Sequence, residues 1–457
     1  MTPQGRLATR EFVGVKLGLV TIRTLVDALG HPERTGTPVI IAGTNGKGSV
    51  TAMVSHALHA AGLRVGRYTS PHLVHLRERF AIDGTPVTDE ALDAALQEVF
   101  DAEDALLASN ALPGPGTYFE LTTATAFVLF RTAAVDVAVL EVGLGGRLDA
   151  TNVVDAPFAA ITSIGFDHMA YLGDSLAHIA AEKAGVIAMG ATVVSGVTDD
   201  EPARVIEQTC TQRHATLIRT ADDVRIATGG SPPGRAGAPT CRAGSASPTN
   251  FPATENTPLT IETPRRTYGP LVLGLRGAHQ AANAAVAVRL LEALEAAGIG
   301  GGRDAIVSGL TQARWPGRLD RRTLPSGAPV VLDGAHNPDG ARALAVWLKD
   351  AAFTPAILVT ACMRDKDVDG LLAPLLPLAS RVIATTVDLP RSLPADALAS
   401  RIATLAPALR VEAVATPADA LRAAASGRAR VVVAGSLFLV GAALAWLDQA
   451  PGPPDPA

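Results

Sequence analysis

Residues suited to chemistry are concentrated at 41–49, where an apolar run gives way to three closely spaced glycines, a lysine and a serine. Val39–Ala42 predicts a buried strand, and apolar residues at three- and four-residue spacing after the serine predict a helix with one buried face. A glycine loop in this position directs backbone N–H groups and the positive helix end at a phosphate. Lys47 adds a cation for the phosphates, and the Ser49 hydroxyl is a ligand for Mg²⁺. The stretch therefore predicts a nucleotide site.

The motif is a variant of the P-loop pattern. The strict pattern has glycine at position 41 and a hydroxyl residue directly after the lysine, whereas this chain has Ile41 and Gly48. The alternative is an ordinary tight turn between a strand and a helix. Because that alternative leaves the lysine and the hydroxyl unexplained, we favour phosphate binding.

Three residues at the ends of other predicted strands suit the same site. Ser70, Glu141 and His168 each follow a different apolar run. Alternating strands and helices predict a parallel, doubly wound sheet, in which ligands bind beyond the carboxyl ends of the strands. We therefore expect these three side chains near Lys47, and their oxygen and nitrogen donors are suited to Mg²⁺.

Several candidate residues also have a structural explanation. A lone serine or histidine at a strand end is often a cap, whereas a carboxylate such as Glu141 must be paired or metal-bound if it is buried. Thr117 and Glu120 fit a capping box, and Asp149 fits a turn after a glycine run. Lys183 lies in the last turn of a predicted helix, where the helix dipole favours a cation. The residues alone leave these alternatives open.

The last third of the chain predicts a smaller, separate unit. Strands and helices alternate there, which is typical of a Rossmann-like α/β domain. We expect a first domain at 1–298 and a second at 303–457, with the glycine-rich stretch 298–302 as linker and candidate hinge. The stretch 229–258 is rich in Gly, Pro and Ser and indicates a solvated insertion.

The second unit has candidate site residues of its own. Asp333 could accept a hydrogen bond from a ribose, and His336 could contact a phosphate, because both follow the first predicted strand of this unit. Arg318 would stabilise a transferring phosphoryl group if it faced a triphosphate, although a turn arginine usually faces solvent. Lys366 and Asp367 form a charge run that we expect at a solvated helix start.

The overall composition narrows the class of protein. A chain of 457 residues that is 48% apolar allows two or three domains, each with its own core. The net charge of -5, with basic and acidic residues interleaved, suggests neither a nucleic-acid partner nor a membrane partner. The three cysteines lack metal-ligand spacing, and no apolar run approaches the roughly 18 residues that span a bilayer. We expect a cytoplasmic monomer that acts on small molecules.

Taken together, these residues resemble a known family, the bifunctional dihydrofolate synthase/folylpolyglutamate synthases of the Mur ligase superfamily. The resemblance runs in family order from about residue 17 to the C-terminus. It departs from the family at Lys16-Leu17, where many members carry an acidic residue. The matching stretches are Ala42–Ser49, Thr69–Leu73, Leu140–Asn152, Asp167-His168, Glu182–Gly185, Pro316–Arg318 and Asp333–Pro338.

The resemblance implies which residues contact the nucleotide, the metal ions and the pterin. ATP would bind between a P-loop central domain of the Mur ligase type and the smaller Rossmann-like domain, with Asn283, Arg318 and Asp333 contacting the nucleotide. Lys183 would be carbamylated and would act as an anionic ligand near the second of two Mg²⁺ ions. The remaining nucleotide contacts would be Thr44, Asn45, Gly46, Lys47, Gly48 and Ser49. The metal ligands would be Ser49, Ser70, Glu141 and His168. The pterin contacts would be Thr117, Tyr118, Phe119 and Glu120 together with Leu148, Asp149 and Ala150.

The activity implied by the resemblance is ATP-dependent amide ligation. Transfer of the γ-phosphoryl group to the carboxylate of dihydropteroate or of a folyl glutamate would give an acyl phosphate, which the amine of L-glutamate displaces. Lys47, Lys183, Arg318 and His336 would be the catalytic residues.

Two alternatives remain. A peptidoglycan-type ligase acting on a UDP-sugar is disfavoured by the pterin-segment matches. A P-loop switch or chaperone that only hydrolyses ATP is disfavoured by the second domain, which carries Arg318 and Asp333.

Overall fold

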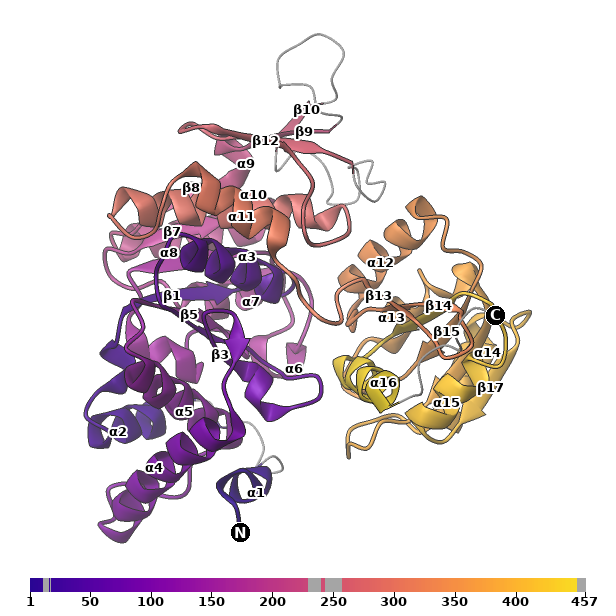
Figure 1. The fold of residues 1–457 in the computed structure, drawn as a ribbon, viewed down its shortest axis with the longest axis horizontal. Coiled ribbons are helices and arrows are strands. Elements are labelled where there is room, and N and C mark those ends of the chain that lie inside the picture. The colour runs from indigo at the N-terminus through magenta and orange to yellow at the C-terminus, as the bar shows by residue number, and fades with distance from the viewer. Residues whose placement is uncertain (11–15, 17, 229–239, 243–256, 450–457) are drawn as a thin grey trace.

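The protein consists of two lobes, seen side by side in Figure 1. The structure is a computed structural model that describes residues 1–10, 16, 18–228, 240–242 and 257–449. Residue 17 and most of the insertion expected at 229–258 lie outside the described residues. No helix in these ranges combines the length and the apolar character needed to cross a bilayer.

A large, mostly parallel sheet forms the centre of the first lobe. In the described part of the chain it has eight strands in the order β4-β3-β2-β5-β1-β6-β7-β8. Every pair from β2 to β8 is parallel, and only the edge strands β3 and β4 pair antiparallel. The predicted α/β class is therefore confirmed. The strands are β1 (Thr37–Ala42), β2 (Val65–Tyr68), β3 (Phe80–Ile82), β4 (Thr85–Pro86), β5 (Val137–Glu141), β6 (Phe158–Ile161), β7 (Thr192–Ser195) and β8 (Thr216–Arg219).

Helices cover both faces of this sheet, because successive residues of each strand point to opposite sides. Val39 and Ile41 of β1 pack with α3, α10 and α11, whereas Ile40 and Ala42 pack with α7 and α8. A third apolar cluster joins α2, α4 and α5 to β2 and β5. The helices of this lobe are α1 (Pro3–Ala8), α2 (Val20–Ala28), α3 (Lys47–Ala60), α4 (Asp89–Ala108), α5 (Tyr118–Ala133), α6 (Met169–Leu172), α7 (Leu176–Ala184), α8 (Asp200–Gln212), α9 (Thr220–Asp223), α10 (His279–Ala296) and α11 (Arg303–Gln312).

A small antiparallel sheet, which the sequence did not predict, lies at the top of the first lobe in Figure 1. Its strands are β9 (Arg225–Thr228), β10 (Thr240–Arg242), β11 (Leu259–Glu262) and β12 (Thr267–Leu271). Ile226, Ile261 and Tyr268 pack into the same core as α10. The sheet is therefore part of the first lobe.

The second lobe is the predicted smaller α/β unit. Its sheet has the order β13-β14-β18-β15-β16-β17 among the described residues, with parallel pairing except at the edge strand β13. The strands are β13 (Asp320–Thr323), β14 (Pro329–Leu332), β15 (Ala356–Thr360), β16 (Ala379–Thr385), β17 (Val411–Val414) and β18 (Val431–Ala434). The helices are α12 (Pro338–Asp350), α13 (Val368–Leu372), α14 (Ala395–Leu405), α15 (Pro417–Ala424) and α16 (Leu437–Gln449).

The second lobe begins later in the chain than residue 303, where we expected the second domain, because its first strand, β13, begins at Asp320. Helix α11, which we assigned to the second domain, packs on α3 and buries Ile306 and Leu310 in the core of the first lobe. The stretch 298–302 is therefore a turn between α10 and α11 and not the hinge. Gly298 and Gly300 have φ of 80° and 95°, which favour glycine, and a Cβ on Gly301 would lie 3.1 Å from the Cβ of Ala61.

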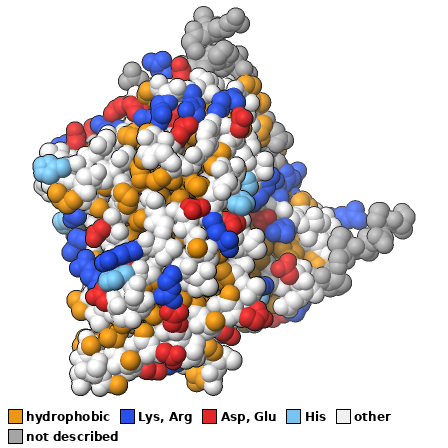
Figure 2. Space-filling model, turned by 60° about the vertical axis from the view of Figure 1, so that its left-hand side comes forward, with side chains coloured by type: hydrophobic (Ala, Val, Ile, Leu, Met, Phe, Trp, Pro, Cys, Tyr) orange, Lys and Arg blue, Asp and Glu red, His pale blue; other side chains and the backbone are white. Residues whose placement is uncertain are grey.

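The surface of the molecule carries charges of both signs. On the face drawn in Figure 2, basic and acidic side chains of the described residues are interleaved. This face therefore shows no extended field of a single sign.

Candidate functional site

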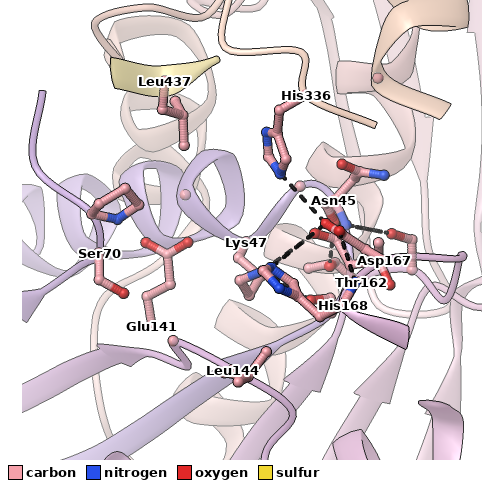
Figure 3. A pocket seen from close by; sticks show the side chains of 18 of the residues that line it. Asn45, Lys47, Ser70, Glu141, Leu144, Thr162, Asp167, His168, His336 and Leu437 are labelled. Carbon is pink, nitrogen blue, oxygen red and sulfur yellow. Dashed lines mark hydrogen bonds and ion pairs between the residues drawn. The ribbon is translucent and has the colours of Figure 1, made fainter. Parts of the chain in front are cut away.

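A cavity of about 1150 Å³ lies between the two lobes, and every residue that we proposed for the site lines it. Figure 3 shows side chains from both lobes converging on this space, with His336 and Leu437 on the side opposite Glu141 and Leu144. The structure therefore brings the candidates together. They are Thr44, Asn45, Gly46, Lys47, Gly48, Ser49, Ser70, Thr117, Tyr118, Phe119, Glu120, Glu141, Leu148, Asp149, Ala150, His168, Lys183, Asn283, Arg318, Asp333 and His336.

The phosphate loop has the predicted geometry. Strand β1 ends at Ala42, and α3 begins at Lys47 with Gly46 as its N-cap. Gly46 has φ of 86°, which strains any other residue, and a Cβ there would lie 2.3 Å from Oδ1 of Asn283. The loop therefore requires glycine at this position, and Asn283 of α10 lies directly against it.

A buried lysine, Lys183, and a half-buried lysine, Lys47, converge on one carbonyl of the phosphate loop. Lys47 Nζ and Lys183 Nζ each donate to the carbonyl oxygen of Gly43 at 2.9 Å. Burial lowers the pKa of Lys47, and burial together with the charge of Lys47 lowers the pKa of Lys183 to about 7. A buried Lys183 that points into the cavity is not explained by the helix dipole, so that alternative is wrong. Near neutral pH, part of the Lys183 amine is uncharged and nucleophilic.

Glu141 ends β5 as a carboxylate that is only 6% exposed. Burial raises its pKa, whereas the positive charges of Lys47 and Arg318 and a hydrogen bond from the backbone N–H of Ser70 oppose this shift. In the view of Figure 3, the carboxylate lies between Ser70 and Lys47. No ion pair with this carboxylate is found among the described residues, so it is available to a cation.

Asp167, which the sequence analysis did not select, joins the two lobes. Its Oδ1 forms an ion pair with Nζ of Lys366, and its Oδ2 lies 3.4 Å from Nε2 of His336. The hydrogen bond to His336 and the charge of Lys366 hold the pKa of Asp167 well below its usual range despite burial. His168 lies next to this pair, with its Nε2 3.4 Å from Lys366 Nζ, and burial lowers the pKa of His168 to about 4. His168 is therefore neutral at physiological pH, with a free lone pair on one ring nitrogen.

Lys366 is not a solvated residue, and our prediction for it is wrong. Its side chain is only 8% exposed, because it reaches across the cavity to Asp167. The prediction for Asp367 is confirmed, since Asp367 is an exposed N-cap that accepts from the N–H of Gly370 at 2.9 Å.

A compositional signal could have identified Lys366. The chain has 39 Lys and Arg residues, of which only five are lysines. Four of these five, Lys16, Lys47, Lys183 and Lys366, line the cavity. In a chain that uses arginine almost everywhere else, a lysine marks a place that needs a compact ammonium group.

The second lobe supplies a loop that faces the phosphate loop. Asp333 accepts from the N–H groups of Leu319 and Ala335, both at 2.9 Å, and burial raises its pKa. Asn337 caps α12 by accepting from the N–H of Gly340 at 2.9 Å, and its side-chain amide donates to Oδ1 of Asn45 at 3.1 Å. The loop that holds Asp333 and His336 therefore contacts the phosphate loop directly.

The two segments matched to pterin contacts are held by their own acidic residues. Glu120 accepts from the N–H and the hydroxyl of Thr117 at 2.9 and 2.8 Å, which is the expected capping box. Asp149 accepts from the N–H groups of Gly143, Leu144 and Thr151, and burial raises its pKa. Both side chains line the cavity, yet these bonds use most of their acceptor capacity. Their role in positioning the segments is observed, and the direct pterin contact stays a prediction.

The donors around the phosphate loop fit a hard divalent cation. Mg²⁺ prefers few protein oxygens together with phosphate and water. The hydroxyls of Ser49 and Ser70 and the available carboxylate of Glu141 line one cavity. No cluster of three His, Cys, Asp or Glu side chains suited to a metal occurs in the described residues, which agrees with a set that contains one carboxylate and one imidazole.

Comparison with known proteins agrees with this architecture. Residues 317–437 match the family described as Mur ligase, glutamate ligase domain. The chain is 35% identical over 382 residues to the dihydrofolate synthase/folylpolyglutamate synthase of Bacillus subtilis, covering 83% of both chains. The folylpolyglutamate synthase of Mycobacterium tuberculosis complexed with ADP and AMPPCP superposes with a TM-score of 0.84, at 33% identity and 98% coverage of both chains. The Yersinia pestis bifunctional folylpolyglutamate synthase/dihydrofolate synthase complexed with AMPPNP and Mn gives a TM-score of 0.79, at 29% identity and 98% coverage of both chains.

A P-loop domain and a second α/β domain that enclose one charged cavity define an ATP-dependent ligase of the Mur ligase type. Among such ligases, the relatives that match most of this chain are dihydrofolate synthases and folylpolyglutamate synthases. The chain belongs to the dihydrofolate synthase/folylpolyglutamate synthase family.

Proposed function

We propose that the protein joins L-glutamate to dihydropteroate, to the γ-carboxylate of folyl(poly)glutamates, or to both, and releases ADP and phosphate. One observation carries this proposal. A single cavity combines the phosphate loop with Lys47 on one wall, Arg318 and Asp333 on the facing wall and the two segments matched to pterin contacts between them. The relatives whose structures contain ADP, AMPPCP or AMPPNP support ATP as the nucleotide.

The chemistry requires activation of the acid. A carboxylate does not react with an amine at neutral pH, because its oxygen is a poor leaving group. Transfer of the γ-phosphoryl group of ATP to the carboxylate oxygen gives an acyl phosphate. The amine of L-glutamate attacks the carbonyl carbon and phosphate leaves, which forms the amide bond.

Different residues of the cavity bind the phosphates and neutralise the charge of the transferring group. The N–H groups of Thr44 and Asn45 already donate to Ser163, so the phosphates are held by the first backbone N–H groups of α3. Lys47 turns from the carbonyl of Gly43 to the β- and γ-oxygens. Arg318, on the other wall, neutralises the charge that spreads over the transferring group. His336 is placed to contact phosphate, since its Nδ1 is bound to the carbonyl of Gly334 at 2.8 Å and its Nε2 faces the first lobe. Closure of the lobes excludes water from the acyl phosphate.

Ser49, Ser70, Glu141 and His168 would hold Mg²⁺. Bound there, the ion would neutralise charge on the phosphates and orient them. The Mn ion in the Yersinia pestis relative supports a divalent metal in this family. A second ion stays a prediction.

Lys183 is suited to carbamylation. Its pKa of about 7 leaves much of the amine neutral, and a neutral amine adds to CO₂ to form a carbamate with loss of one proton. The product carries a negative charge in place of a positive one. Beside Lys47, this change would replace repulsion with an ion pair. The prediction is tested by intact-protein mass measurement in bicarbonate buffer.

The deciding experiment measures ADP release with dihydropteroate or tetrahydrofolate, each with and without L-glutamate. We expect release that requires both the acid and L-glutamate, and the pair of acids shows which of the two activities is present. Release that is indifferent to both would identify an ATPase that joins nothing. Release with UDP-muramoyl substrates and an amino acid would identify a peptidoglycan-type ligase. The cytoplasmic location and the monomeric state stay predictions, which fractionation and size-exclusion chromatography test.

A further inference from the structure

Arg79 is a buried cation on the cavity wall that the proposed mechanism does not use. It is the last residue of a short 3-10 helix (Leu76–Arg79) that leads into β3, it is 8% exposed, and it lines the cavity. An arginine this deep is costly to bury unless an anion accompanies it.

No carboxylate of the described residues pairs with Arg79. Its Nε donates to Nδ1 of His72 at 2.9 Å, and its guanidinium lies 5.2 Å from the centre of the Tyr118 ring. These are neutral partners, and among the described residues the terminal nitrogens of Arg79 have no hydrogen-bond acceptor. Since Arg79 lines the cavity, these nitrogens are available to a ligand that binds there.

Two other cations line this part of the wall. Arg10 pairs with the fully buried Glu103 at 3.2 Å, and Lys16 is exposed and donates to the hydroxyl of Thr21 at 3.3 Å. Arg79 is therefore the buried cation of these three that has no charged partner among the described residues.

The position of Arg79 indicates which part of a ligand it meets. Its carbonyl accepts from the N–H of Thr69 at 3.0 Å, which fixes its backbone next to Ser70. Its side chain reaches Tyr118, the first helical residue of the segment matched to pterin contacts. A group bound by Arg79 therefore lies between that segment and the residue proposed to hold the metal. The acid substrate would bind through its ring at the segment matched to pterin contacts and would be phosphorylated at its carboxylate near the metal. The group that lies between these two places, next to Arg79, is therefore the carboxylate end of the acid.

We propose that Arg79 binds the carboxylate of the acid substrate, with His72 as a positioning residue. This inference rests on the proposed function and names the group that orients the acid for phosphorylation. His72 is suited to its part because an unprotonated Nδ1 is needed to accept from Arg79. Its Nδ1 accepts from Nε of Arg79 at 2.9 Å, and this bond leaves the two terminal nitrogens of the guanidinium for a ligand.

The test compares Arg79→Met with wild type in steady-state kinetics and in calorimetric binding. We expect the KM for dihydropteroate to rise about 10- to 100-fold, as for loss of a charged hydrogen bond, and the KM for ATP to stay within twofold. Binding of the same pterin compound without its carboxyl group should stay within twofold of wild type. Arg77→Met is the matched control, since Arg77 belongs to the same short helix but does not line the cavity.

The outcomes separate the two proposals. An Arg79→Met enzyme with the wild-type KM for dihydropteroate overturns this assignment and leaves the proposed function intact. Equal loss of affinity for the acid and for the carboxyl-free compound also overturns it, because Arg79 would then act on the ring or on the fold. A wild-type protein that binds no pteroate overturns the proposed function and this assignment together. Should Arg79→Met fail to bind ADP, Arg79→Gln decides, since it removes the charge and retains a donor for His72.

Discussion

In the first lobe, β1 leads through residues 43–46 into α3; in the second, β14 leads through residues 333–337 into α12. The two units have the same order of strand, polar loop and helix, and their loops meet through Asn45 and Asn337. Their polar groups are used differently. The first loop is rich in glycine and has two lysines at the carbonyl of Gly43, whereas the second uses its own side chains to bind its own backbone.

This difference shows what makes a strand–loop–helix unit a ligand site. In the first lobe, Ser163 accepts from the N–H groups of Thr44 and Asn45 at 2.8 and 3.0 Å, whereas the N–H groups at the start of α3 remain for a ligand. In the second lobe, Asp333 and Asn337 satisfy the backbone, which gives a stiff loop that presents His336 and contacts its counterpart. We infer that the first unit binds the reacting phosphates and that the second aligns the lobe that carries Arg318.

The largest effect is expected from Lys47→Ala, which removes the mobile cation of the first unit. Loss of one charge from the transferring group should lower ADP release about 10²–10³-fold. The matched control is Lys349→Ala, which removes an exposed lysine in the last turn of α12. Near-normal turnover of the Lys47 variant would refute the role of the phosphate loop and with it the contrast between the units.

A smaller effect is expected from the ion pair that joins the lobes. Lys366→Met leaves Asp167 as a buried carboxylate, and the lobes can relieve this by opening and hydrating it. We expect a roughly tenfold loss of turnover for Lys366→Met and for Asp167→Asn, with a coupling of about 1–3 kcal/mol between them.

The measurements are kcat for both single variants and the double variant, together with the radius of gyration by X-ray scattering. If the two losses simply add and the radius does not change, the pair does not align the lobes. Arg342→Met is the matched control, because its ion pair with Asp339 is exposed and stays within the second lobe.

A third prediction concerns the cost of burying Lys183. The folded-state pKa of about 7 lies below the usual value of 10.5, so between these values the unfolded chain holds a proton that the folded chain releases. Stability should therefore rise with pH across this window, and the cost of burial is fully present below it. Lys183→Met should raise the melting temperature by a few degrees at pH 6.5 in CO₂-free buffer, with a gain that fades towards pH 10.

Bicarbonate at pH 8 provides the second readout for Lys183. It should stabilise the wild type, because a carbamate beside Lys47 is paired, and it should leave Lys183→Met unchanged. The prediction is contradicted if the higher melting temperature of Lys183→Met does not depend on pH. It is also contradicted if bicarbonate stabilises the wild type and Lys183→Met equally.

The residues that the sequence revealed share one property: each follows a strand of the parallel sheet. Lys47, Ser70, Glu141 and His168 could be grouped without coordinates, because the carboxyl ends of parallel strands meet at one edge. The pair that it missed is formed across the lobes. Asp167 follows the same strand as His168, but its partner Lys366 is 199 positions away, and periodicity carries no information about such a pair.

The sequence analysis also failed where one local pattern has two possible structural causes. The glycines at 298–302 suggested a flexible linker, yet a tight turn also requires glycine where the backbone has positive φ, as at Gly298 and Gly300. Arg79 was overlooked for a similar reason, because a single arginine in a polar turn is usually solvated. Only the fold shows that β3 returns it to the cavity beside Tyr118.

The smallest effect is expected where the two loops touch. Asn337→Ala removes the cap of α12, which should cost about 1 kcal/mol of unfolding free energy, and it also removes the contact with Asn45. Thr416→Ala is the matched control, because Thr416 caps α15 of the same lobe in an exposed position. We expect Asn337→Ala to exceed the control by about 0.5–1 kcal/mol in denaturant unfolding and the excess to vanish in an Asn45→Ala background. An excess that persists without Asn45 would mean that the contact between the two asparagines does not hold the lobes together, and that the excess comes from the helix cap or from the hydrogen bond of Asn337 to Asp167 at 3.4 Å.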